Sequence, residues 1–213
     1  RLYYQVSKKG SHVLTKSFLG FTLNNGPLGE TLEIKQVAHS AFSEKWDQVW
    51  GEEITVDNTY NQMIITAVEK DGLQRTFDVI FRVFNDGIGF RYHFPEQENL
   101  KDFIVMDELT EFALAKDGDA WSIPAYHTEY YEGLYNKSAV SALDTVCTPL
   151  TIEVNDGTYL AIHEANLTDY AAMNLNPKSQ GNTLKAELTP WSTGEKAFLK
   201  APFSTPWRTV IIA

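Results

Sequence analysis

Short runs of β-branched and aromatic residues recur along most of the chain, and clusters of Gly, Asn, Asp and Pro separate them. This pattern predicts β-strands joined by turns. The clearest example is 73–84, because successive residues of a strand point to opposite sides and alternate positions here are apolar. One face of this strand carries Phe77, Val79, Phe81 and Val83. The sequence Asn85-Asp86-Gly87 then predicts a tight turn into a second alternating strand over 88–94.

Further strands are expected at regular intervals, and helical periodicity is scarce. They fall at 2–7, 18–23, 33–37, 61–68, 107–114, 151–154, 159–164, 171–175, 183–188 and 209–212. Two more hairpin turns are predicted at 70–72 and 155–157. Because strand follows strand without intervening helices, the sheets should be antiparallel and packed face to face. The sequence therefore predicts an all-β fold, a large two-sheet sandwich forming one domain over 1–213, with Trp46 and Trp50 in its core.

The composition excludes several classes of partner. The formal net charge is −10 and the Lys and Arg residues form no basic stripe, which argues against nucleic acid. No apolar run approaches the roughly 18 residues of a membrane span, so none is expected. The single Cys147 has no partner for an internal disulfide. The chain opens at Arg1 without Met and ends in the apolar run 207–213, so both ends are expected to be cut.

Familiar catalytic signatures are missing: no glycine-rich phosphate loop, nucleophile elbow, paired CxxC or HExxH. The segment 124–135 resists the strand pattern, and its density of aromatic and carboxylate side chains predicts a loop that contacts another molecule. Aromatic faces stack on sugar rings or fill a domain interface. The candidate substrate-binding residues of this loop are Tyr126, His127, Glu129 and Tyr130.

Glu164 ends the apolar strand 159–164 and is a candidate calcium ligand, because calcium prefers carboxylate oxygens. Its neighbour His163 should point to the opposite face of the sheet. A single carboxylate binds calcium poorly, and a solvated or hydrogen-bonded glutamate is the alternative interpretation.

Several stretches, in the same order, resemble the amino-terminal domain of glycoside hydrolase family 97. They are Ser17-Phe18-Leu19-Gly20, Trp46-Asp47-Gln48-Val49-Trp50-Gly51-Glu52, the hairpin 81–95, Trp121-Ser122-Ile123-Pro124-Ala125-Tyr126, His163-Glu164-Ala165-Asn166-Leu167 and Thr205-Pro206-Trp207-Arg208. The resemblance implies a β-super-sandwich like that of galactose mutarotase, leading into a TIM barrel that holds the catalytic carboxylates. It also implies calcium dependence, with one glutamate of the amino-terminal domain, here Glu164, lent to the calcium site. His163 stands where the family more commonly has a small hydroxyl residue.

The resemblance thus implies a non-catalytic domain of a periplasmic or secreted α-glycosidase. Its partners would be the catalytic barrel of the same polypeptide and an oligosaccharide substrate. Inverting α-glucosidases and retaining α-galactosidases both occur in the family, and both remain open. One alternative is a stand-alone carbohydrate-binding module that uses 126–135 as an aromatic platform. Another is a mutarotase-like epimerase, which would need a His and a carboxylate as acid and base; no second His lies in a matching motif.

Overall fold

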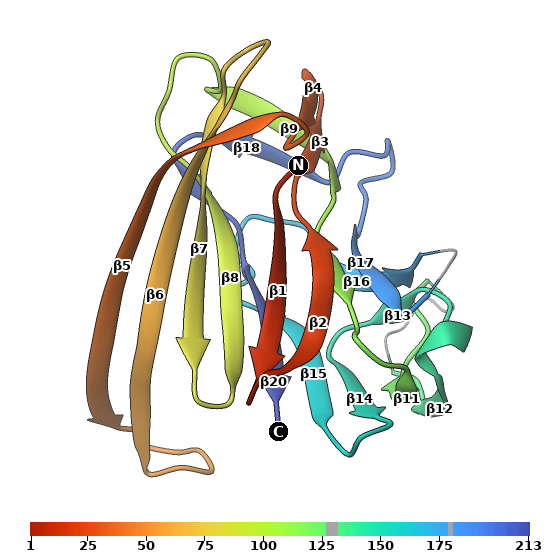
Figure 1. Cartoon of the computed structure of the whole chain (residues 1–213). Coiled ribbons are helices and arrows are strands. Elements are labelled where there is room, and N and C mark those ends of the chain that lie inside the picture. Colours follow the sequence, from red (N-terminus) through yellow and green to blue (C-terminus); the bar gives the residue numbers. More distant parts are fainter. Residues whose placement is uncertain (127–131, 179–180) are drawn as a thin grey trace.

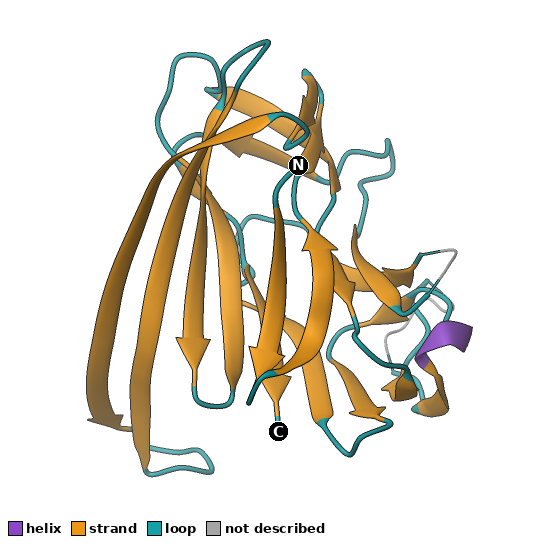
Figure 2. Cartoon of the chain, in the orientation of Figure 1, coloured by secondary structure: helices purple, strands orange, loops and turns teal. Residues whose placement is uncertain are grey.

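The computed structural model describes residues 1–126, 132–178 and 181–213, and the described chain is built almost entirely from β-strands (Figure 1, Figure 2). The largest sheet contains ten strands, and neighbouring strands in it are antiparallel. Nine of them follow the order β12 (Asn136–Ala139), β11 (Gly118–Ser122), β14 (Leu150–Val154), β15 (Tyr159–Ala165), β20 (Trp207–Ile212), β8 (Gly87–Phe94), β7 (Thr76–Phe84), β6 (Thr55–Glu69) and β5 (Leu32–Asp47), and β19 (Phe203–Ser204) pairs with β8.

A second layer covers the middle of this sheet. It consists of the hairpin β1 (Tyr3–Lys8) and β2 (Ser11–Phe18) and of a four-stranded sheet. That sheet has the order β10 (Glu111–Ala113), β17 (Thr183–Leu188), β16 (Met173–Pro177) and β13 (Val146–Cys147). A bridge between Leu14 and Leu114 continues the layer from β2 to β10. We call the side of the large sheet that faces β1 and β2 its inner face, and the opposite side its outer face.

A smaller sheet closes one end of the sandwich, at the top of Figure 1. Its order is β18 (Ala197–Lys200), β9 (Asp102–Glu108), β3 (Phe21–Leu23) and β4 (Gly26–Leu28). One short 3-10 helix spans Val140–Ala142. No helix within the described residues has the length and hydrophobicity to span a membrane.

The core lies between the layers and follows the alternation in the sequence. Phe77, Val79 and Phe81 of β7 are buried, and so are Phe90, Tyr92 and Phe94 of the adjacent β8. From the small end sheet, Phe21 packs edge-on against Tyr92 and Phe94, with ring centroids 4.6 and 5.3 Å apart. Burying one such aromatic side chain contributes about 1.5–3 kcal/mol. The predicted all-β antiparallel sandwich and the three predicted hairpin turns are confirmed.

The placement of Trp46 and Trp50 in the core is wrong. Trp46 is 44% exposed and Trp50 is 86% exposed. Both belong to the hairpin of β5 and β6, which is far longer than the predicted strand 33–37. The hairpin extends past the second layer, so both faces of β5 are exposed. The expected strand 18–23 is also divided, since the chain bends at Gly20 between β2 and β3. A Cβ there would lie 2.9 Å from the Leu28 carbonyl oxygen, so glycine is required.

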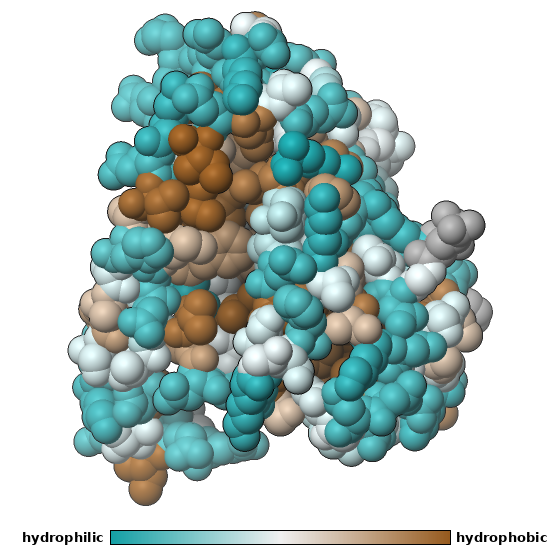
Figure 3. All heavy atoms as spheres, viewed as in Figure 1, coloured by the Kyte–Doolittle hydropathy of each residue, from teal (hydrophilic) through white to brown (hydrophobic). Residues whose placement is uncertain are grey.

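The inner face of the large sheet is incompletely covered. Beyond β1, apolar side chains of β6 to β8 line a groove of ≈ 490 Å³, and the hydrophobic patch beside β1 is visible in Figure 3. The groove is lined among others by Leu2, Met63, Ile65, Phe81, Val83 and Ile88. This explains why Val83, predicted on the core face, is 49% exposed.

Candidate functional site

Glu164 lies near the end of β15, directly opposite Arg208 of β20. Its side chain points to the inner face and is 12% exposed. Both carboxylate oxygens have protein donors: the Met173 amide donates to Oε1 at 2.9 Å, and Arg208 Nη1 donates to Oε2 at 2.8 Å. Glu164 is therefore held in one orientation at the margin of the core rather than buried among apolar groups.

Arg208 is also paired with a second carboxylate, Glu108 of β9, and both side chains are completely buried. The pair is bidentate, with Nε to Oε1 at 2.9 Å and Nη2 to Oε2 at 2.7 Å. Two hydroxyls complete the acceptor positions of Glu108: Thr110 donates at 2.8 Å and Tyr170 at 3.0 Å. Such a pair is stable in the interior only because each charge is matched and hydrogen-bonded.

The ionisation of this network follows from its contacts. Burial alone raises the pKa of Glu108, but the charge of Arg208 and the hydrogen bonds from Arg208, Thr110 and Tyr170 outweigh it, so the net shift is downward. Burial lowers the pKa of Arg208, and Glu108 more than reverses this. Burial, followed by the charge of Glu108, raises the pKa of Tyr170 well above its usual value. By formal charge, the triad of Glu108, Arg208 and Glu164 has two acidic groups and one basic group, a balance of −1.

Three residues near Glu164 have left-handed backbone conformations that are uncommon outside glycine. Asn166 (φ 58°) and Asp169 (φ 51°) lie in the loop that follows β15, and Tyr126 (φ 60°) is the last residue of the described range 1–126. Strain of this kind costs of order 1–3 kcal/mol per residue and often marks functional segments. The loop after β15 thus has a specific shape that returns the chain to Met173, the donor to Glu164.

Tyr126 and Glu164 both accept hydrogen bonds from residues of strand β16. The side-chain amide of Asn174 donates to the Tyr126 hydroxyl at 3.2 Å, and the preceding residue, Met173, donates to Glu164. Tyr126 is 59% exposed, so its ring is accessible. The other loop candidates, His127, Glu129 and Tyr130, lie outside the described residues.

The expected alternation at the end of β15 is confirmed. His163 lies opposite Thr209, one position from the pairing of Glu164 with Arg208, and so faces the other side of the sheet. Its Nδ1 lies 3.1 Å from the Glu164 carbonyl oxygen. Within the described part of the chain, no group of three or more His, Cys, Asp or Glu side chains is arranged to hold a metal ion. Glu164 therefore does not belong to a complete metal-binding cluster among these residues.

Sequence reasoning missed Arg208, which is ion-paired with Glu164, and Glu108, which is ion-paired with Arg208. Arg208 belongs to the Thr-Pro-Trp-Arg stretch, to which no role was assigned, and Glu108 lies in an ordinary strand 100 residues away. One signal was available. The arginine of β20 lies on the same face of the strand as its buried apolar residues, so it is directed into the core and needs a buried anion.

Comparison with known proteins gives a consistent result. The sequence model of the family described as "Glycosyl-hydrolase 97 N-terminal" matches residues 1–213. A retaining α-galactosidase of Bacteroides thetaiotaomicron is 24% identical over 90% of this chain and 30% of its own length. A probable retaining α-galactosidase of Streptomyces bingchenggensis is 28% identical over 99% of this chain and 32% of its own length. The chain thus spans about a third of the length of these curated relatives.

Solved structures share the fold. A glycoside hydrolase family 97 enzyme from Pseudoalteromonas sp. strain K8, solved with acarbose, superimposes with a TM-score of 0.94 at 37% identity, covering 99% of this chain and 32% of that one. A β-arabinopyranosidase gives a TM-score of 0.90 at 21% identity over 99% of this chain and 36% of that one, which supports the fold alone.

Proposed function

The chain belongs to the glycoside hydrolase family 97 amino-terminal domain family, and from this premise we propose that it is the non-catalytic domain of a calcium-dependent α-glycosidase. It packs on a catalytic barrel of the same polypeptide and supplies it with a calcium ligand, Glu164, and with substrate-contacting side chains. The observation that carries this proposal is the rigid presentation of Glu164 by Arg208 and the Met173 amide.

The two carboxylates of the site are poorly suited to glycosidic bond cleavage on their own. Glycosidases place two carboxyl groups on either side of the scissile bond, one of them able to donate a proton. Here Glu108 is completely buried, its pKa is lowered, and both carboxylates are paired with the same arginine. This arrangement favours a structural and positioning role, with the acid and base chemistry in the barrel.

The site is compatible with a calcium ion that is completed by another module. Each oxygen of Glu164 accepts one hydrogen bond from the described residues and retains a further lone pair, and the triad has an uncompensated negative charge at its exposed end. Calcium takes 6–8 oxygen ligands, so most of them would come from outside this chain. When bound, the ion supplies positive charge that organises and polarises the reacting groups. We therefore expect the isolated chain to bind calcium only weakly, as calorimetric titration would measure.

Residues 126–135 form the proposed substrate rim. Tyr126 supports this assignment, because its hydroxyl is tied to the strand that also holds Glu164 while its ring stays accessible. His127, Glu129 and Tyr130 are proposed as further contacts to an oligosaccharide. A periplasmic or secreted location is part of the same proposal.

Activity assays test whether catalysis requires the part of the protein outside this chain. The 213-residue chain and the full-length protein are assayed on aryl α-glucosides and aryl α-galactosides, with and without calcium. We expect turnover by the full-length protein only, and the preferred substrate identifies the specificity. Robust turnover by the isolated chain would refute the proposal.

The exposed ring of Tyr126 also fits a stand-alone carbohydrate-binding module. Titration of maltose and galactose oligosaccharides into the isolated chain separates the two functions. Millimolar or tighter affinity that is lost in Tyr126→Ala would favour the binding module. No heat at millimolar ligand would favour the scaffold.

A further inference from the structure

The outer face of the large sheet carries two arginines that share one tryptophan. Arg82 of β7 and Arg91 of β8 each place the guanidinium carbon 4.6 Å from the ring centroid of Trp207 in β20. The two cations are therefore separated by less than one Debye length, about 10 Å at 0.1 M salt, and repel each other.

Neither of these arginines has a carboxylate partner among the ion pairs of the described residues. The buried arginines Arg75 and Arg208, in contrast, are each paired with glutamate. Arg82 donates from Nε only to the Gln62 side chain, at 3.0 Å. The Nε of Arg91 is buried and has no hydrogen-bond partner within residues 1–126, 132–178 and 181–213. An unsatisfied buried guanidinium nitrogen is unusual and costly, particularly in a chain with 28 acidic residues.

The electrostatics of the pair favour a neighbouring anion. Burial, and then the charge of Arg82, lower the pKa of Arg91. The nearest acidic position along β7 is Asp78, which accepts a hydrogen bond from Thr66 at 2.7 Å. An added carboxylate would relieve the repulsion, and guanidinium and carboxylate match in a bidentate geometry.

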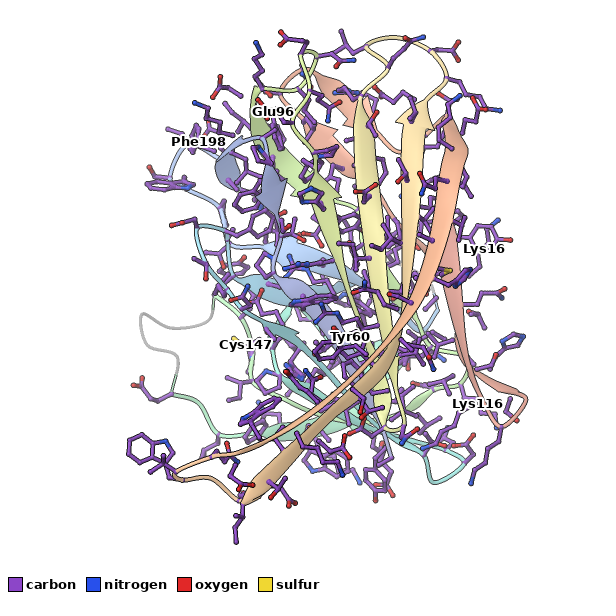
Figure 4. The ribbon with its side chains drawn as sticks, turned by 90° about the vertical axis from the view of Figure 1, so that its left-hand side faces the viewer. Lys16, Tyr60, Glu96, Lys116, Cys147 and Phe198 are labelled. Atoms are coloured by element: carbon purple, nitrogen blue, oxygen red, sulfur yellow. The ribbon has the colours of Figure 1, made fainter. Side chains whose placement is uncertain are left out.

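The shape of the face also suits a large partner. In Figure 4, Tyr60 and Lys16 lie on opposite sides of the large sheet, and the hairpin of β5 and β6 bends towards the Tyr60 side, so the outer face is concave there. Tyr60 belongs to the cluster, because Arg82 lies 4.4 Å from its ring centroid. Nucleic acid fits poorly against a chain of net charge −10. A neutral sugar would leave the two cations unpaired, and the Trp207 ring already contacts both guanidinium groups.

We propose that this outer face is where the catalytic module of the same polypeptide packs, and that the module places an aspartate or glutamate side chain against Arg91 and Arg82. The inference rests on the proposed function, because the carboxylate comes from that module. The inference specifies which face of the domain the catalytic module covers and which side chains hold the module there.

The test compares the full-length protein with the isolated chain. In both, Arg91→Met removes the charge while keeping a similar length, and Lys16→Met removes a charge on the opposite side as a matched control. In the full-length protein, Arg91→Met should raise the rate of native-state proteolysis within this domain about 10-fold or more, the effect of losing a charged hydrogen-bonded pair. Arg91→Lys, which keeps the charge, should restore part of the protection.

The isolated chain separates anchoring from internal stability. There, Arg91→Met should leave the melting temperature unchanged or raise it, because it removes a repulsion and an unsatisfied donor. Equal destabilisation of the isolated chain and the full-length protein would overturn the proposal in favour of a structural role. No change in either would overturn it as well. A rise in the melting temperature of the isolated wild-type chain with acetate, together with unaltered proteolysis of full-length Arg91→Met, would identify a small-anion site and also overturn it.

The same experiment distinguishes this inference from the proposed function. If the domain is cleaved equally fast in the wild-type full-length protein and in isolation, it does not pack on a module and the proposed function itself fails. If the full-length protein is protected and Arg91→Met leaves that protection intact, only the assignment of this face fails.

Discussion

Replacing Arg208 by Met should be among the most destabilising single changes in this domain. The substitution leaves Glu108 buried, with its charge unpaired and only Thr110 and Tyr170 as donors. Breaking one side of a buried ion pair costs about 3–5 kcal/mol. For a domain of this size, 1 kcal/mol corresponds to about 2–4 °C, so the melting temperature should fall by about 6–20 °C.

The measurement is urea unfolding of the isolated chain at pH 7, followed by far-ultraviolet circular dichroism. Lys137→Met, which breaks the exposed pair with Asp119, serves as the control and should leave the midpoint essentially unchanged. The double variant Arg208→Met with Glu108→Met should be more stable than Arg208→Met alone, because the completely buried unpaired charge is gone and the remaining carboxylate, Glu164, is partly exposed and keeps the Met173 amide as a donor. An Arg208→Met variant as stable as the wild type would refute the idea that the arginine and its two carboxylates form one interdependent unit.

Three further predictions concern the domain alone. Because the pKa of Glu108 is lowered in the folded state, its ionised form stabilises the fold above the unfolded pKa of about 4.3, and this stabilisation is lost as the pH falls through the folded pKa. The pKa values of Tyr92 and Tyr170 are raised, so their contribution to stability is present below about pH 10 and is lost as the pH rises above it. The free energy of unfolding from urea titrations should therefore decline on both sides of this window, and a flat profile would contradict the assignment. Gly87→Ala should cost about 1–3 kcal/mol in the same assay, because its Cβ would lie 2.3 Å from a backbone oxygen of β20; an unchanged midpoint would contradict the close approach. Trp50→Ala should alter stability by less than about 0.5 kcal/mol, since the side chain is 86% exposed, and a larger loss would place it in a core.

The sequence predicted the parts of the fold in which one face of each strand is buried. Strands β7 and β8 were recognisable because Phe77, Val79, Phe90 and Tyr92 alternate with polar residues and turn sequences flank them. Most of β5 was missed because both of its faces are exposed, which removes the alternation on which the prediction depends. Trp46 was misplaced for the same reason: a large aromatic residue favours the core only where a second layer is present to cover it.

The candidate site was predictable only in part. Glu164 emerged from its position at a strand end and from the family resemblance, and the alternation with His163 followed from strand geometry. The partners of Glu164 did not emerge, because Arg208 and Glu108 are separated by 100 residues and meet only when β9 and β20 are assembled in space. Local periodicity contains no information on such long-range pairs.

The most direct test of the account is the calcium dependence of the full-length protein when Glu164 is replaced by Gln. We expect that the isolated Glu164→Gln chain keeps its fold, while the full-length variant needs a much higher calcium concentration for half-maximal activity than the wild type. An unchanged calcium requirement in a correctly folded Glu164→Gln protein would contradict the claim that this domain presents a metal ligand to its catalytic neighbour.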